Sequence, residues 1–421
     1  MIDVGPMPSG GREVATASHP RLTERHVLAL GLGVSGLFIL AAAVSAAAAL
    51  IGGRSSWAAL HLALAGSATM AIGAFMPHFA ITLAGTRASP AAQRLASLAA
   101  LAAGSSGVVL GVSLFGQLWV AIGTGLVVVG LATVGWHTFA PLREPLARRH
   151  PVVAGAYGTA LVELAIGVVL GGLGATGVSA VTMHWALLRP AHAWLTLFGA
   201  ISLTIFATLV YLAPTVLGAR IRAGRSLVAA TIGIGVGPAV VAIGFALDLR
   251  PMILVGMGLT SLGAAGQIGY VVDCYRRRGP FTTEHDWRAV SIGHLLAGPA
   301  WFAAAVVAAL LEMAGGRPLA GWSIGLLAVP MVAGWMLQEL VGSWTHLVPS
   351  VTPGGPELHA RQRRVLAVAA RTRVGIWNAG VGLAWAGSAL DVAPLAVVGL
   401  ATLAVSIAVA LAGLARALTI R

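Results

Sequence analysis

Long apolar stretches fill almost the whole chain and are separated only by short polar segments. Twelve of them can cross roughly 30 Å of hydrocarbon as helices that rise about 1.5 Å per residue. Charged residues make up only 9% of the sequence, whereas a soluble protein carries about 25%. The sequence therefore predicts an all-α integral membrane protein with twelve transmembrane helices. The stretches cover residues 27–50, 57–84, 92–114, 116–138, 150–174, 190–217, 225–247, 251–275, 287–312, 320–346, 364–388 and 392–418.

The placement of arginine predicts the direction of each span. The chain has 26 basic residues, all of them arginine. Only Arg54, Arg189, Arg250 and Arg317 follow odd-numbered spans, and the rest lie in the tail, the even-numbered loops or the C-terminal end. By the positive-inside rule, both termini are therefore cytoplasmic and the protein is a multi-pass protein of the cell membrane. The lipid bilayer is its expected partner. The basic excess is a topology signal, so no nucleic-acid partner is expected.

The chain also carries a weak internal repeat. Residues 1–26 are predicted to form a cytoplasmic tail, because they mix both charge signs with glycine and proline. Beyond the tail, His78, Tyr211 and His346 occupy equivalent places near the ends of the second, sixth and tenth spans. The steps between them correspond to about four spans each, which predicts three parallel four-helix repeats with pseudo-threefold symmetry. Their predicted boundaries are 27–149, 150–286 and 287–421; chance similarity between apolar helix ends is the alternative.

This arrangement resembles heme-copper oxidase subunit I and the related NnrS-like membrane proteins. The runs that carry the resemblance begin at His61 (His-Leu-Ala-Leu-Ala-Gly-Ser-Ala-Thr-Met) and at His192 (His-Ala-Trp-Leu-Thr-Leu-Phe-Gly). The chain looks closer still to actinobacterial membrane proteins associated with copper nitrite reductase-like multicopper oxidases, through His78-Phe79 and the run from Gly342 to Pro349. The resemblance implies heme, copper or both as cofactors and a periplasmic multicopper oxidase as a partner. It also implies that His61 ligates heme and that His192 binds a metal.

Part of the ligand set of this family is missing. Span seven contains no histidine, although the corresponding family helix carries the histidine pair of the copper B centre. The outer half of span ten, around Trp322, lacks the two heme-ligating histidines of the family. The standard binuclear centre for reduction of oxygen or nitric oxide is therefore not expected. A role in copper or nitrogen-oxide metabolism is expected instead of a terminal oxidase.

Four residues near the outer face are candidate metal or heme ligands. His61 and His192 open two spans at the same depth, and neutral imidazole is a common ligand for iron and copper. Met183 and His184 precede His192, and Pro190 between them is expected to break the helix so that His184 folds beside His192. Thioether and imidazole together suit copper(I). The alternatives are interfacial histidines and an ordinary loop.

A second set of polar residues lies deeper or on the inner side. His78, Tyr211 and His346 are interpreted as an inner polar cluster, either a gate or proton entry or a set of ordinary helix ends. Glu163, Gln338 and Glu339 lie within spans, where an ionisable group is a functional hypothesis. The acids are candidates for a proton relay or for solute coupling, and a neutral acid that joins two helices is the alternative.

Three functions remain open at this stage. The first is a heme- or copper-binding membrane protein. The second is a transporter or channel for a small solute or metal ion, with Glu163 and Glu339 as coupling groups. The third is a structural partner that docks a multicopper enzyme. A visible spectrum and metal analysis distinguish the first from the other two.

Overall fold

The computed structural model describes residues 23–52, 55–143, 151–222, 224–280, 287–352 and 354–420. Within these ranges every regular element is a helix, as expected for an all-α membrane protein. Almost all of the predicted tail, residues 1–26, lies outside the described ranges. Its last residues do not behave as a tail, because the first helix, α1 (Glu24–Gly52), already begins at Glu24. The helix thus includes the last three residues of the predicted tail.

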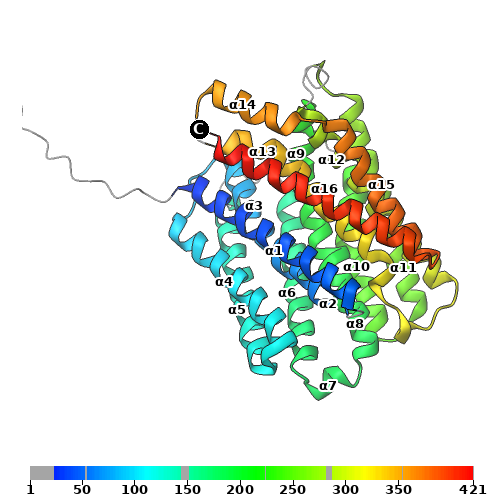
Figure 1. Ribbon diagram of the computed structural model, residues 1–421. Helices are drawn as coiled ribbons and strands as arrows, with labels where there is room; N and C mark the ends of the chain where they lie inside the picture. Colours follow the sequence, from blue (N-terminus) through cyan, green and yellow to red (C-terminus); the bar gives the residue numbers. More distant parts are fainter. Residues whose placement is uncertain are drawn as a thin grey trace, which may run out of the picture.

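Figure 1 shows the helices in chain order from blue to red, and the predicted repeat boundaries divide them into three groups. The first group contains α1, α2 (Trp57–His61), η1 (Leu62–Ala68), α3 (Thr69–Ala84), α4 (Ala91–Leu110), η2 (Gly111–Phe115) and α5 (Gln117–Leu142). The second contains α6 (Pro151–Ala175), α7 (Ser179–Thr182), α8 (Trp185–Ala193), η4 (Trp194–Ile201), α9 (Ser202–Leu217), α10 (Arg225–Ala246) and α11 (Arg250–Arg276). The third contains α12 (Trp287–Ala314), η6 (Leu319–Gly321), η7 (Ile324–Leu327), η8 (Val329–Met336), α13 (Leu337–Val351), α14 (Pro356–Ala367), α15 (Ala370–Ala389) and α16 (Ala393–Thr419).

Eleven helices of the described ranges are long and apolar enough to cross a bilayer. The predicted short turn between spans three and four is confirmed: η2 ends at Phe115, Gly116 takes a φ of 91°, and α5 begins at Gln117. This positive φ favours glycine because it has no Cβ. The predicted eleventh span corresponds to α15, which has 20 residues but carries two arginines in its first turn. Its crossing of the membrane therefore stays a prediction.

The start of that eleventh span was predicted wrongly. Residues 364–367 do not belong to a membrane helix but to α14, which ends at Ala367, and the chain then turns through Ala369 at a φ of 51°. In α14, Gln362 and Leu366 are buried while the arginines are exposed. The buried face of α14 packs against α16 and α12. Figure 1 shows α14 across one end of the bundle, with the start of α1 and the end of α16 near the same end.

The second long helix of each group is the most buried. Between 61% and 78% of the most apolar part of these three helices is buried, against 17% for α16. Each contains a π-helical stretch close to its start, namely η1, η4 and η8. Each also carries a proline near the opposite end, at Pro77, Pro214 and Pro349. These central helices are therefore built alike and form the core of the bundle.

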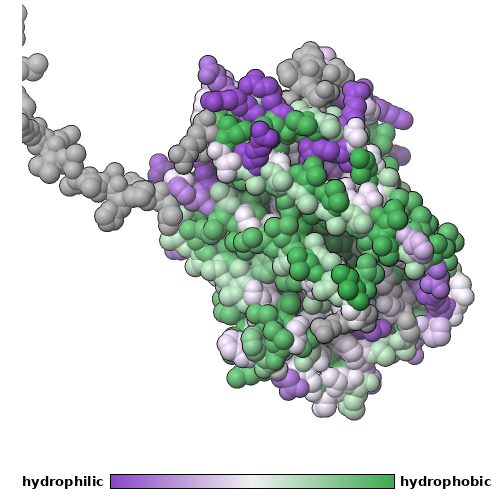
Figure 2. Space-filling view, in the orientation of Figure 1, coloured by the Kyte–Doolittle hydropathy of each residue, from purple (hydrophilic) through white to green (hydrophobic). Residues whose placement is uncertain are grey.

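The surface is divided as a membrane protein requires. Apolar side chains cover the middle of the face seen in Figure 2, and hydrophilic side chains gather at the end where α14 lies. Exposed arginines at that end include Arg361, Arg364 and Arg416. The opposite end carries α7 and α8 (Figure 1). The two ends are called the α14 side and the α7 side below.

Candidate functional site

The structure brings His61 and His192 together on the α7 side. His61 is the last residue of α2, directly before η1, and His192 lies in the last turn of α8, directly before η4. The centroids of the two imidazole rings are 6.3 Å apart, and the ring planes differ by only 6°. Two histidines from different parts of the chain thus lie parallel at one depth. Their predicted proximity is confirmed.

Backbone carbonyl groups fix the tautomer of both rings. Nδ1 of His61 lies 2.9 Å from the carbonyl oxygen of Trp57, and Nδ1 of His192 lies 2.7 Å from that of Gly167. Because a carbonyl oxygen only accepts hydrogen bonds, Nδ1 of each ring carries the proton. Nε2 of each ring therefore keeps its lone pair. In metalloproteins, this is how a ligating histidine is held and oriented by its surroundings.

The two rings are also held by their neighbours. The Trp57 ring stacks on His61 with centroids 4.0 Å apart. On the other side of the pair, Gly171 of α6 leaves room for the His192 ring. A Cβ at this position would lie 2.8 Å from Cε1 and 3.0 Å from Nδ1 of that ring. The site therefore depends on a glycine at position 171.

The donor set of this site is small. In the described part of the chain, no three His, Cys, Asp or Glu side chains are grouped closely enough to hold a metal ion. The pair offers two nitrogen donors, whereas structural zinc sites use four protein ligands. Two imidazoles would suffice only for a group that brings further donors of its own, such as heme, or for an ion that takes few ligands, such as copper(I).

Met183 and His184 do not join the pair. Helix α8 continues through Pro190, so the expectation that this proline breaks the helix was wrong. His184 directly precedes α8. His192 is eight positions farther along the helix, a rise of about 12 Å. Both His184 and Met183 are exposed, Met183 at 74%. Pro190 cannot donate an intrahelical hydrogen bond, but α8 nevertheless continues through it into η4.

Of the predicted inner cluster, His78 lies on the α14 side within an ion-pair network. Its Nδ1 is 3.0 Å from Oε1 of Glu24, and Oε2 of Glu24 pairs with the guanidinium of Arg94. The side chain of Arg94 is only 2% exposed, and its Nη2 also donates to the carbonyl oxygen of Ala74 at 3.2 Å. The sequence analysis missed this network because it assigned Glu24 to the tail and used Arg94 only as evidence for topology. The available signal was that Glu24, an acidic residue, lies directly before the first apolar stretch.

Tyr211 and His346, the other two members, lie near groups of their own part of the chain. Tyr211 lies near Tyr157 and Tyr270. His346 lies near Arg288 of α12 and Arg363 of α14. The three positions are equivalent along the central helices, but their chemical surroundings differ. Their joint action as a gate or proton entry stays a prediction.

The two membrane-embedded acids have similar surroundings. Glu163 and Glu339 are 4% and 2% exposed, and neither carboxyl oxygen of either residue has a hydrogen-bond partner among the described residues. Each lies against a glycine of a neighbouring helix, Glu163 against Gly199 of η4 and Glu339 against Gly298 of α12. A Cβ at either glycine would overlap the carboxyl group. Each carboxyl group therefore occupies space that is free only because the neighbouring residue is glycine.

Gln338 has a different role from its neighbour Glu339. Its Oε1 lies 2.8 Å from Nδ1 of His294, and its Nε2 donates to Gly334 at 2.9 Å and to Oδ1 of Asn378 at 3.1 Å. Trp301 Nε1 donates to the same Oδ1 at 2.7 Å. This network joins α12, η8, α13 and α15. The sequence assigned no role to His294. The only sign that it faces the bundle was its position about one turn into the predicted ninth span.

Comparisons with protein-family models and with curated proteins found no match to this chain. The site is therefore interpreted from its geometry.

Proposed function

We propose that this chain is a membrane-embedded heme- or copper-binding protein in which His61 and His192 hold the metal. One observation supports this proposal above all: two parallel imidazoles, 6.3 Å apart, each with Nδ1 bound to a backbone carbonyl group. An interfacial histidine would be solvated by water or lipid headgroups and would need no such anchoring. Fixed rings with free Nε2 lone pairs are the arrangement that a metal requires.

Different protein groups would have different roles at this site. His61 and His192 would supply the two nitrogen donors, and the carbonyl groups of Trp57 and Gly167 keep the proton on Nδ1, away from the metal. Trp57 covers one face of the His61 ring. When bound, heme or copper supplies one-electron redox chemistry.

The resemblance to heme-copper oxidase subunit I and NnrS-like proteins fits this interpretation, since the family places metal-binding histidines at these two helix starts. The π-helical stretches η1, η4 and η8 support the proposal of three parallel repeats. The third group has Leu327 and Ala328 directly before its π-helical stretch, where the other two have histidine nearby. Together with the missing copper B histidines, this favours a role in copper or nitrogen-oxide metabolism over a terminal oxidase. A periplasmic multicopper oxidase is the proposed partner, and the α7 side is the proposed outer face.

The test is an absorption spectrum and a metal analysis of the full chain, purified from cells supplied with both heme precursor and copper. We expect a Soret band or stoichiometric copper in the unaltered protein and its loss in His61→Ala and in His192→Ala. His184→Ala serves as the matched control, because His184 is an exposed histidine close in sequence and outside the pair. The proposal is refuted if the unaltered protein binds neither, or if the double variant His61→Ala/His192→Ala still binds the same amount.

A further inference from the structure

A groove runs between α1 and α16 on the outer surface of the bundle. Figure 1 shows these two helices side by side and antiparallel, and a Cβ at Gly36 of α1 would lie 3.8 Å from Cδ2 of Leu411 of α16. The volume of the groove is about 190 Å³, far more than the roughly 10–15 Å³ that one water molecule requires. The residues that line it come from α1, α13 and α16 and are apolar. The groove therefore fits an apolar ligand.

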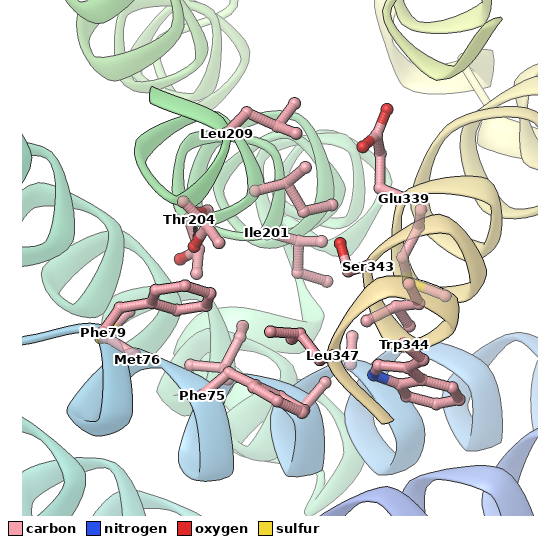
Figure 3. Close-up of a pocket in the computed structure, with 17 residues that line it drawn as sticks. Phe75, Met76, Phe79, Ile201, Thr204, Leu209, Glu339, Ser343, Trp344 and Leu347 are labelled. Carbon is pink, nitrogen blue, oxygen red and sulfur yellow. Dashed lines mark hydrogen bonds between the residues drawn. The ribbon is translucent and has the colours of Figure 1, made fainter. Parts of the chain in front are cut away.

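The groove is open toward the surroundings of the protein and closed toward its core. Leu37 and Leu40 of its lining are 65% and 45% exposed, whereas Trp344 of α13 is 2% exposed. Trp344 also lines a cavity inside the bundle, and Figure 3 shows its indole ring beside that cavity. A buried aromatic ring thus separates the groove from the interior. A ligand in the groove would reach it directly from the membrane.

Two glycines of α1 create much of the free space. A Cβ at Gly33 would meet nothing within 4 Å, and a Cβ at Gly36 would meet only Leu411. Small residues in membrane helices commonly allow two backbones to approach closely. Here they leave a gap between α1 and α16 instead. Larger side chains could occupy both positions without a clash at Cβ, so the gap can be filled by substitution.

The groove leads to an exposed arginine on the same face of α1. Arg25 precedes Leu32 by seven residues, about two helical turns, so the two share one face of the helix. Its neighbour Glu24 is engaged by His78 and Arg94. Among the described residues, no acid forms an ion pair with Arg25 itself. The groove therefore ends near a cation that is available to a ligand.

The distance from the groove to Arg25 matches one leaflet of a bilayer. From Leu40, at the far end of the lining on α1, to Arg25 the helix rises by about 22 Å. Half of a bilayer, with its headgroup region, is about 20–22 Å thick. When the end of an acyl chain lies near Leu40, the headgroup of the same lipid is therefore level with Arg25.

We propose that this groove binds one anionic phospholipid, with an acyl chain between α1 and α16 and the phosphate group at Arg25. The apolar lining matches the chain, and a guanidinium group matches the phosphate. Most arginines of the chain lie on the α14 side, which the positive-inside rule assigns to the cytoplasm. The cytoplasmic leaflet is also the one that carries anionic lipids. The site does not depend on a metal at the histidine pair.

Native mass spectrometry of the full chain tests this proposal. The delipidated protein in detergent is titrated with phosphatidylglycerol or with phosphatidylcholine of the same acyl chains. We expect one phosphatidylglycerol per chain, bound about fivefold more tightly than phosphatidylcholine, which is the effect of roughly one basic residue near an anionic group. Arg25→Gln should abolish this preference. Arg87→Gln is the matched control, because Arg87 is an exposed arginine just after α3 on the same side.

Variants that fill the groove test the acyl-chain part independently. Gly33→Leu and Gly36→Leu should each weaken binding of both lipids by about tenfold or more, because several methylene groups lose their apolar contacts. Gly125→Leu should bind normally, since Gly125 is an exposed glycine of α5 whose Cβ would meet nothing within 4 Å. Size-exclusion chromatography checks that each variant folds, and the arginine and glycine variants can be judged separately.

Three results would overturn the proposal. The first is equal binding of both lipids to the unaltered chain, or no lipid bound, as expected if another part of the chain fills the groove. The second is a pair of variants, Gly33→Leu and Gly36→Leu, that bind lipid as well as Gly125→Leu does. The third is a dimer of the unaltered chain that both groove variants dissociate, which would show that a second copy covers this face.

Discussion

The pairing of Glu24 with Arg94 allows a quantitative test of the α14 side. The guanidinium of Arg94 is 2% exposed, and Glu24 is its only acidic partner among the described residues. Its remaining described bond is a single donation to Ala74. Glu24→Gln keeps the shape of the side chain but removes its charge, so that a buried cation is left unpaired. Breaking a buried ion pair in this way costs about 3–5 kcal/mol.

The expected loss for this pair lies below that range. The side chain of Glu24 is 28% exposed, so water reaches part of the pair and replaces some of the lost interaction. We therefore expect Glu24→Gln to lower the free energy of unfolding by about 2 kcal/mol. Arg94→Met alone should cost less, because the carboxylate that remains is partly hydrated. The double variant Glu24→Gln/Arg94→Met should recover most of the loss, since it leaves no buried charge.

The assay is reversible unfolding in mixed detergent micelles, with increasing SDS as denaturant. Glu357→Gln is the matched control, because Glu357 is an exposed acid of α14 on the same side of the bundle, and it should change stability by less than about 0.5 kcal/mol. The reasoning fails if Glu24→Gln is as stable as this control. It fails equally if the double variant is no more stable than Glu24→Gln alone.

Three further substitutions test close packing and the polar network. Gly171→Ala should displace the His192 ring and abolish metal binding while the protein still folds, as judged by absorption and size-exclusion chromatography; Gly155→Ala on the same helix, where a Cβ meets nothing within 4 Å, should bind normally. Gly123→Ala should cost about 1–3 kcal/mol in the same unfolding assay, because its Cβ would lie 2.6 Å from the amide nitrogen of Val108, whereas Gly125→Ala faces open space and should be neutral. Asn378→Leu leaves Trp301 Nε1 without its acceptor and should cost about 1–3 kcal/mol; an unchanged midpoint would show that the network adds nothing to stability.

The sequence predicted those parts of the fold that depend on hydropathy and charge. Spans such as 57–84 and 225–247 agree with the helices to within a few residues, because an apolar run must be helical where no water can satisfy its backbone. The predicted start of a span at residue 364 was wrong because the charged residues before it were not expected to be helical. Arg361, Arg363 and Arg364 were assigned to a loop, although arginines on one face of a helix can lie along the membrane surface.

The candidate site was only partly predictable. That His61 and His192 lie near the same side of the bundle was predicted from their positions at helix starts, and in the structure their rings are 6.3 Å apart. Their anchors could not be foreseen, because a backbone carbonyl group such as that of Gly167 leaves no sequence signature and lies 25 residues from its histidine. The same holds for the pairing of Glu24 with Arg94, which are 70 residues apart. Side chains that meet only through helix packing have no short-range pattern.

The π-helical stretches connect the fold to the histidine pair. A π-helical turn contains one residue more than an α-helical turn, so the residues before it are rotated by about 100° relative to an uninterrupted α-helix. In η1 and η4 this extra residue follows His61 and His192 almost at once. The remainder of each helix can therefore keep its apolar face on the bundle axis while the histidine at its start turns toward its counterpart. The third stretch, η8, follows the 3₁₀-helix η7 and has Leu327 and Ala328 before it, with no histidine at these positions. Two of the three central helices have a histidine just before the π-helical stretch, and these two histidines form the pair.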